Sequence, residues 1–244
     1  MTNELSKFQP EVSPQDIAQL TRGKAFLPQI AIVAGTSKVI GQQHMPPGRF
    51  YLKQKNPEDC IPLGTFGKDT DGIKKGIVEL GIGVYRYHAM LFDDANNLLK
   101  ESFNNKDTVW DEIKREADRK NKGASYGLDF LMFVPPHMLK FEEIENQAAA
   151  NDLRKQFKDG ATAIFFYKST ALQFAPHKVE PGTALRIKST QIVKPTFSWW
   201  VPSEKEIIKD QTWFKPQALL SEASKFQQDV PEVIDKVPEG TISR

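Results

Sequence analysis

The stretch Ile73–Phe92, with the sequence IKKGIVELGIGVYRYHAMLF, decides the fold class of this chain. Its pattern is that of a β-strand, and it is longer than most strands. Gly76, Gly81 and Gly83 interrupt it, and glycines inside a strand mark bulges or sharp bends. We therefore expect a strand that bends strongly, as in a curved sheet or a small barrel.

Shorter strands are predicted on both sides of this stretch, separated by glycine and proline turns. They are Pro28–Gly35, Gly48–Lys55, Cys60–Phe66, Leu98–Phe103, Tyr126–Val134 and Ala161–Ser169, followed by one or two strands within Ala184–Pro202. Apolar residues take helical spacing at Lys106–Lys122, which predicts a helix with Asp107 or Thr108 as its cap. Residues 139–158 are predicted to form one helix or a broken one. The sequence predicts a mainly β fold with inserted helices (α+β), built as an OB-like curved sheet or small barrel with peripheral helices.

Three segments follow from this pattern. Residues 1–26 form a polar lead-in with one short helix after Ser13-Pro14, and residues 27–203 form the β-rich core domain. Residues 204–244 form a polar C-terminal segment, helical at Glu204–Asp210 and Pro216–Gln228 and flexible near its end. We therefore expect one β-rich core domain between two polar end segments.

Charge, cysteine count and hydropathy exclude several classes of protein. The chain has 33 Lys and Arg against 31 Asp and Glu, so any electrostatic binding must come from a local patch, and residues 151–203 carry 8 basic and 3 acidic residues. The single cysteine, Cys60, excludes an internal disulfide and a multi-thiolate zinc site. No export signal or apolar run of about 20 residues is present, so we expect a cytoplasmic protein, in the host cell if the protein is viral, without membrane insertion.

Catalytic motifs fail the test of spacing. The stretch Gly35–Gly41 lacks the second glycine of a phosphate-binding loop, and Gly81-Ile82-Gly83 lacks the third glycine of a dinucleotide site. The histidines are scattered singly, which predicts no metal site. We expect a protein without enzymatic activity, metal or cofactor. A metal-dependent nuclease stays open as a third reading, and it would use Glu79, Asp93 and Asp94.

Aromatic and basic residues interleave on the predicted strands. Strand alternation places Tyr51 with Lys53 on one face, and Tyr85 with Tyr87 opposite Arg86 and His88. Rings of this kind stack on bases while cations contact phosphates, which is how single-stranded nucleic acid is bound. A β core built from the same rings stays open as the alternative. The candidate nucleic-acid-binding residues are Tyr51, Lys53, Lys55, Tyr85, Arg86, Tyr87, Tyr167, Lys168, Arg186, Lys188 and Trp199.

Four segments between residues 27 and 202 resemble a loose group of bacteriophage and mobile-element proteins. They are Leu27–Ile30, Met45–Phe50, Tyr126–Pro135 and Ala163–Thr170. Members of that group include suspected single-stranded DNA-binding proteins, so the resemblance implies an OB-type barrel that binds the strand across its curved sheet. Many members carry a Cys-rich zinc ribbon where this chain has Asn104–Ser125, a charged segment without cysteine.

The leading hypothesis is therefore a non-catalytic single-stranded DNA-binding protein of phage-type replication or recombination. The alternative is a phage structural or assembly protein without a nucleic-acid role. In phage single-stranded DNA-binding proteins an acidic C-terminal tail recruits replication partners, so the resemblance implies the same role for the C-terminal segment. Its stretch Asp229–Glu239 is only mildly acidic. The sequence leaves the oligomeric state and the choice between DNA and RNA open.

Overall fold

The computed structural model describes residues 27–34, 45–53, 60–68, 72, 74–209, 211–216, 219 and 226. The fold is mainly β, with 48% strand and an open mixed sheet, which confirms the predicted mainly β fold with inserted helices. The described strands are β1 (Gln29–Ile32), β2 (Phe50–Lys53), β3 (Ile61–Pro62), β4 (Thr65–Lys68), β5 (Lys74–Phe92), β6 (Leu98–Ser102), β7 (Ala124–Val134), β8 (Ala161–Lys168), β9 (Ala184–Lys194) and β10 (Phe197–Ile208). The described helices are α2 (Thr108–Asp118), α3 (Gln147–Gln156) and three short 3₁₀ helices, η4 (Pro136–Met138), η5 (Phe141–Glu143) and η6 (Ser169–Phe174).

The chain divides into two compact units. The larger unit consists of residues 27–86 and 127–228, and the described part of the smaller unit is Tyr87–Tyr126. Because the smaller unit is an insertion in residues 27–203, the segment predicted as one core domain contributes to both units. The larger unit contains strands in the order β10-β9-β5-β7-β8-β1-β2-β3, and β4 pairs with β5. The β1–β8 pair is parallel, whereas β1–β2, β7–β8 and β9–β10 are antiparallel.

Contacts across the larger unit join parts of its sheet that are distant in the strand order. The Ser189 hydroxyl on β9 donates to the Gly48 carbonyl, just before β2, at 2.6 Å. The same hydroxyl accepts from the Gly76 amide on β5 at 2.9 Å. The Trp200 ring of β10 lies so close to Gly48 that a Cβ there would be 2.7 Å from it. Strands that are far apart in the sheet order therefore meet, but the sheet stays open and an OB fold is not confirmed.

The predicted irregularity in β5 lies at Gly83. Ile82 belongs to the main hydrophobic cluster, whereas Val84 packs against a second cluster, although residues two apart in a regular strand share one face. A Cβ on Gly83 would lie 2.8 Å from the Leu131 carbonyl oxygen, and one on Gly81 would lie 2.5 Å from the Phe214 ring. The glycines therefore permit close approach of neighbouring groups, and the alternation changes phase at Gly83.

The sheet of the larger unit has apolar side chains on both faces. On β7 and β8, Phe130, Met132, Phe165 and Tyr167 belong to the main cluster, and we call their side the first face. The residues between them point the other way, to a second face. There Leu131 and Ile164 pack with residues from the C-terminal part of the chain, namely Phe214, Leu219 and Phe226.

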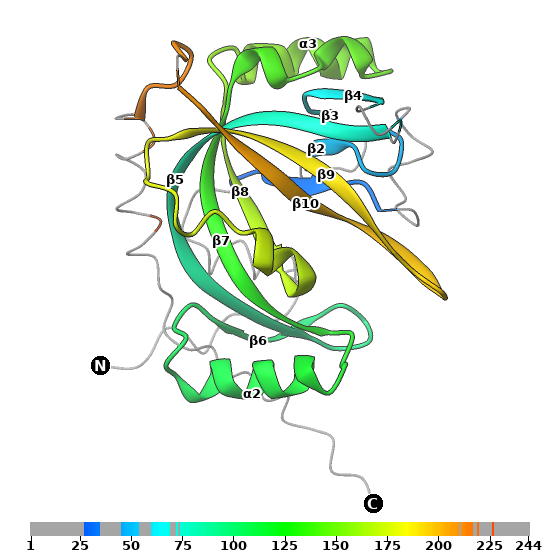
Figure 1. Ribbon diagram of the computed structural model, residues 1–244, viewed down its shortest axis with the longest axis vertical. Coiled ribbons are helices and arrows are strands. Elements are labelled where there is room, and N and C mark those ends of the chain that lie inside the picture. Colours follow the sequence, from blue (N-terminus) through cyan, green and yellow to red (C-terminus); the bar gives the residue numbers. More distant parts are fainter. Residues whose placement is uncertain are drawn as a thin grey trace, which may run out of the picture. The chain divides into compact units, whose positions relative to one another are not determined.

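The smaller unit packs one helix on strands. Asp107 caps α2 by accepting from the Trp110 amide at 2.6 Å, which confirms the predicted helix and its cap. Val109, Trp110 and Ile113 are buried with Ala89 of β5. In Figure 1, α2 runs alongside β6.

One helix prediction requires correction, and one of two alternatives is settled. Glu204–Asp210 was predicted to be helical, but residues up to Ile208 belong to β10, where Glu206 pairs with Arg186 of β9 and Ile207 with Leu185. Cross-strand pairing along the long hairpin, visible in Figure 1, overrides the local polar pattern. The segment 139–158 is broken into η5 and α3, because Asn146 caps α3 by accepting from the amides of Ala148 and Ala149. The predicted helix before residue 27, and most of the one at Pro216–Gln228, lie outside the described residues.

Candidate nucleic-acid interface

A row of aromatic rings runs along the first face of the larger unit. Its ring centroids are 6.1 Å apart for Phe50–Phe165, 4.6 Å for Phe165–Tyr167, 5.4 Å for Tyr167–Phe130 and 5.3 Å for Phe130–Tyr85. We call these five rings the aromatic row. Tyr167 is 1% exposed, whereas Tyr85 is 39% exposed. The row therefore starts in the core, and its last ring meets solvent.

Three of the candidate residues lie inside the protein rather than on its surface. Tyr51 is buried with Val33, Met45 and Cys60, and burial, followed by the nearby Cys60 thiol, raises the pKa of its phenol. Burial also raises the pKa of Tyr167 far above its ordinary value. Rings enclosed in this way have no face for a base, so Tyr51 and Tyr167 are removed from the candidate surface.

Arg86 is the third buried candidate. Its Nε lies 3.5 Å from Oδ2 of the buried Asp129, and its Nη1 donates to the Phe226 carbonyl at 3.1 Å. The guanidinium also lies over the Phe226 ring, 4.2 Å from the centroid. Arg86 therefore holds the C-terminal part of the chain on the second face and does not contact phosphates in this conformation.

The predicted alternation along Tyr85–His88 agrees with the exposure of these side chains. Tyr85 and Tyr87 are both 39% exposed, whereas Arg86 and His88 are buried. In the smaller unit, the Tyr87 ring packs edge-on against Trp110, with a centroid distance of 5.6 Å and an interplanar angle of 84°. Both tyrosines therefore remain candidates, Tyr85 in the larger unit and Tyr87, separately, in the smaller unit.

Trp199 lies on the β9–β10 hairpin and is held from two sides. Its Nε1 donates to the Thr170 hydroxyl of η6 at 3.0 Å, and the Lys194 ammonium lies 5.7 Å from its ring centroid. Lys194 was not among the predicted residues. It pairs across the hairpin with Phe197, two residues from Trp199, so only the strand register brings it to the ring.

The basic candidates differ in their surroundings. Lys53 and Lys168 are exposed, and the pKa of Lys168 is lowered by desolvation and then by the positive charge of Lys53. Arg186 donates to Glu79 Oε1 at 2.9 and 3.1 Å and to Glu206 at 3.0 Å, and the Glu79 hydrogen bonds are the main cause of its raised pKa. Two carboxylates thus neutralise Arg186. Lys188 is half-buried, and Lys55 lies outside the described residues.

Two of the three acidic residues proposed for a nuclease, Glu79 and Asp93, are engaged by local partners. Glu79 pairs with Arg186, and its Oε2 lies 3.4 Å from Nε2 of His137. Asp93 accepts from the Ala95 and Asn97 amides and from the Asn97 side chain, and the side-chain bond is the main cause of its lowered pKa. Among the described residues, no group of three or more His, Cys, Asp or Glu side chains could hold a metal ion.

No protein family, no curated protein and no solved structure matches this chain. Within the part of the chain that the structure describes, no helix is both long and apolar enough to cross a bilayer.

Proposed function

We propose that this protein binds single-stranded DNA without catalysis, with the larger unit as its main binding element. The observation that carries the proposal is Tyr85, whose ring packs on Phe130 at 5.3 Å and is 39% exposed. A ring supported from below loses little conformational freedom when a base stacks on it. Stacking is worth about 1–3 kcal/mol per base and is tolerant of base identity.

Exposed cations supply the electrostatic part of the proposed binding. Lys53 and Lys168 are exposed on the larger unit, and desolvation, followed by the charge of the nearby Lys53, lowers the pKa of Lys168. A phosphate relieves this repulsion because it adds a negative charge between two positive ones. Lys194 beside Trp199 places a cation and a ring together on the hairpin, the pair of groups that a nucleotide requires.

Contacts between distant parts of the sheet support an OB-like mode of binding, in which the strand lies across a curved sheet. The Ser189 contact with Gly48 joins β9 to the residues just before β2, a strand far from β9 in the sheet order. The proposed role is phage-type replication or recombination in the cytoplasm, and it rests on the resemblance to phage proteins. Replication proteins as partners of residues 204–244 belong to the same proposal.

A structural or assembly role is the second candidate, and the hairpin favours it. Val193 of β9 is 72% exposed and Ile207 of the edge strand β10 is 55% exposed. Apolar side chains on an edge strand are a common site for pairing with another chain. A protein partner would bury both residues.

Titration of a fluorescent oligothymidylate with the full chain, followed by anisotropy at two salt concentrations, tests the proposal. We expect binding that weakens with salt, and a loss of about 5- to 150-fold for Tyr85→Ala, the equivalent of 1–3 kcal/mol for one stacked base. Tyr167→Phe is the matched control, because it changes a buried tyrosine of the same row and leaves the surface intact. Absence of binding at low salt would overturn the proposal, and co-assembly with capsid or tail proteins lost in Val193→Glu would establish the second candidate instead.

A further inference from the structure

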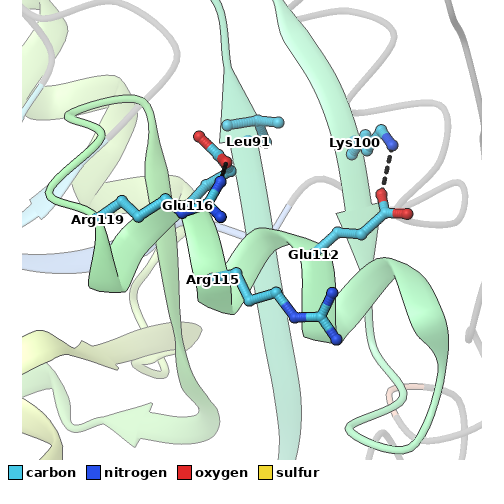
Figure 2. A pocket seen from close by; sticks show the side chains of 6 residues that line it. All are labelled: Leu91, Lys100, Glu112, Arg115, Glu116 and Arg119. Atoms are coloured by element: carbon cyan, nitrogen blue, oxygen red, sulfur yellow. Dashed lines mark hydrogen bonds and ion pairs between the residues drawn. The ribbon is translucent and has the colours of Figure 1, made fainter.

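The smaller unit contains a groove between one flank of α2 and the strands beside it. Its volume is about 320 Å³, and the residues lining it are Leu91, Lys100, Glu112, Arg115, Glu116 and Arg119. Figure 2 shows Glu112, Arg115 and Glu116 of α2 and its C-cap Arg119, with Lys100 on the neighbouring strand β6. A volume of this size lies at the lower end of the range for small-molecule sites, about 300–1,000 Å³.

The charges in this groove do not balance. The Lys100 ammonium pairs with Glu112 Oε2 at 2.6 Å, and Arg119 Nη1 pairs with Glu116 Oε1 at 3.2 Å. Arg115 is exposed and forms no ion pair with any residue that the structure describes. Among the described residues that line the groove, three are cations and two are carboxylates, and the cation without a carboxylate partner among them is Arg115, which Figure 2 draws without a dashed line.

The geometry of α2 places a second arginine beside the first. Arg115 and Arg119 are four residues apart, so they are neighbours on one flank of the helix. A guanidinium presents five N–H donors in a planar fork that matches the oxygens of a phosphate. Arg119 uses one nitrogen for Glu116 and keeps other donors that face outward from that pair.

We propose that this groove binds a phosphate group carried on a nucleotide, with Arg115 as the principal contact and Arg119 as the second. The inference rests on the proposed function, since it gives the smaller unit its own contact with the nucleic acid. Glu112 and Glu116 stay paired with Lys100 and Arg119, so they do not repel the phosphate strongly. Leu91 supplies an apolar surface for the attached sugar, which a bare inorganic ion would leave unused.

The first test uses dTMP as the probe and the full chain labelled with ¹⁵N. Millimolar dTMP should shift the Arg115 side-chain signal and the amide signals of residues 112–119, and Arg115→Gln should abolish the response. Lys122→Gln is the control, because it removes the same charge from an exposed position of the same unit that does not line the groove. No shift with dTMP, or a shift that persists in Arg115→Gln, would overturn the inference.

The second test measures oligothymidylate affinity against salt for the same variants. Each lost phosphate contact on a single strand lowers the slope of log K against log salt by about 0.7. We expect this change in Arg115→Gln, with affinity weakened about two- to fivefold as for an exposed ion pair, and no change in Lys122→Gln. An unchanged slope in Arg115→Gln would overturn the inference. If the chain binds no oligonucleotide at all, the proposed function fails, and the dTMP titration still decides the groove.

Discussion

The two faces of the sheet in the larger unit are built in different ways. The first face carries most of the aromatic row, whose side chains come from the strands themselves, such as Phe130, Phe165 and Tyr167. The second face is completed by Phe214, Leu219 and Phe226, which follow the last strand. The main cluster on the first face also includes helix and loop residues such as Phe141 and Leu153, and Tyr85 meets solvent at the end of the aromatic row.

A second comparison concerns charge, between a buried ion pair and an exposed one. On the second face Arg86 and Asp129 are both buried, and Arg86 also donates to the Phe226 carbonyl. Arg186, in contrast, pairs with Glu79 and Glu206 while its side chain is 39% exposed. Removing Asp129 would leave the charge of Arg86 in the interior without its carboxylate, which is costly. Water screens the exposed Arg186 pairs, so losing one of them costs less.

The strongest test of the comparison is Asp129→Ala. Removing the carboxylate leaves the buried Arg86 guanidinium without that counter-charge, so we expect the free energy of unfolding to fall by about 3–5 kcal/mol. Urea denaturation followed by circular dichroism measures the change. Glu206→Ala, which removes an exposed partner of Arg186, should cost less than about 1 kcal/mol. Equal losses in the two variants would contradict the distinction between buried and exposed pairs.

Tyr167→Ala tests the interior of the aromatic row. The side chain is 1% exposed and touches Phe130 and Phe165, so its removal leaves a cavity and should cost about 3–4 kcal/mol, in the range seen when large aromatic side chains are deleted. Tyr85→Ala, at the exposed end, should cost about 1 kcal/mol or less. The same urea series compares them. A larger loss for Tyr85→Ala would mean that this ring serves the core and not a ligand.

Gly81→Ala tests the close packing of the C-terminal part of the chain on the second face. The added Cβ would lie 2.5 Å from the Phe214 ring, and overpacking of this kind costs about 1–3 kcal/mol. Gly67→Ala on β4 is the matched control, because nothing lies within 4 Å of its Cβ. Thermal denaturation should lower the melting temperature of the first variant only. A stable Gly81→Ala protein would show that Phe214 can move without loss.

The smallest effect at neutral pH is expected for Tyr167→Phe, and it grows in alkali. Burial raises the pKa of Tyr167 in the folded state, so the unfolded chain releases this proton first, near pH 10, and the wild type loses stability as the pH rises above that value. The phenylalanine variant lacks this loss. Unfolding free energies at pH 7 and pH 11 measure it. Identical losses in both proteins would show that the Tyr167 phenol reaches water.

The amino-acid sequence predicted the long strand at Ile73–Phe92 because its composition and glycine pattern are local properties. It also predicted α2 with Asp107 or Thr108 as the cap, and the structure has Asp107 in that position. The extension of β10 through Glu206 was missed, because pairing with Arg186 on β9 is a contact between residues 20 positions apart. The charge pairing of Arg186 escaped prediction for the same reason, since its carboxylates come from other strands.

By itself, the sequence determined that the fold is mainly β, that Tyr85 and Arg86 point to opposite faces, and that aromatic and basic residues alternate on strands. Strand alternation is a two-residue period, so one sequence is enough to read it. Only the tertiary structure decided which of these residues are accessible. Tyr85 and Tyr167 have the same side chain on similar strands, yet one is exposed and the other is enclosed. Their difference depends on which neighbouring strands and segments cover each ring, and those neighbours come from distant parts of the chain.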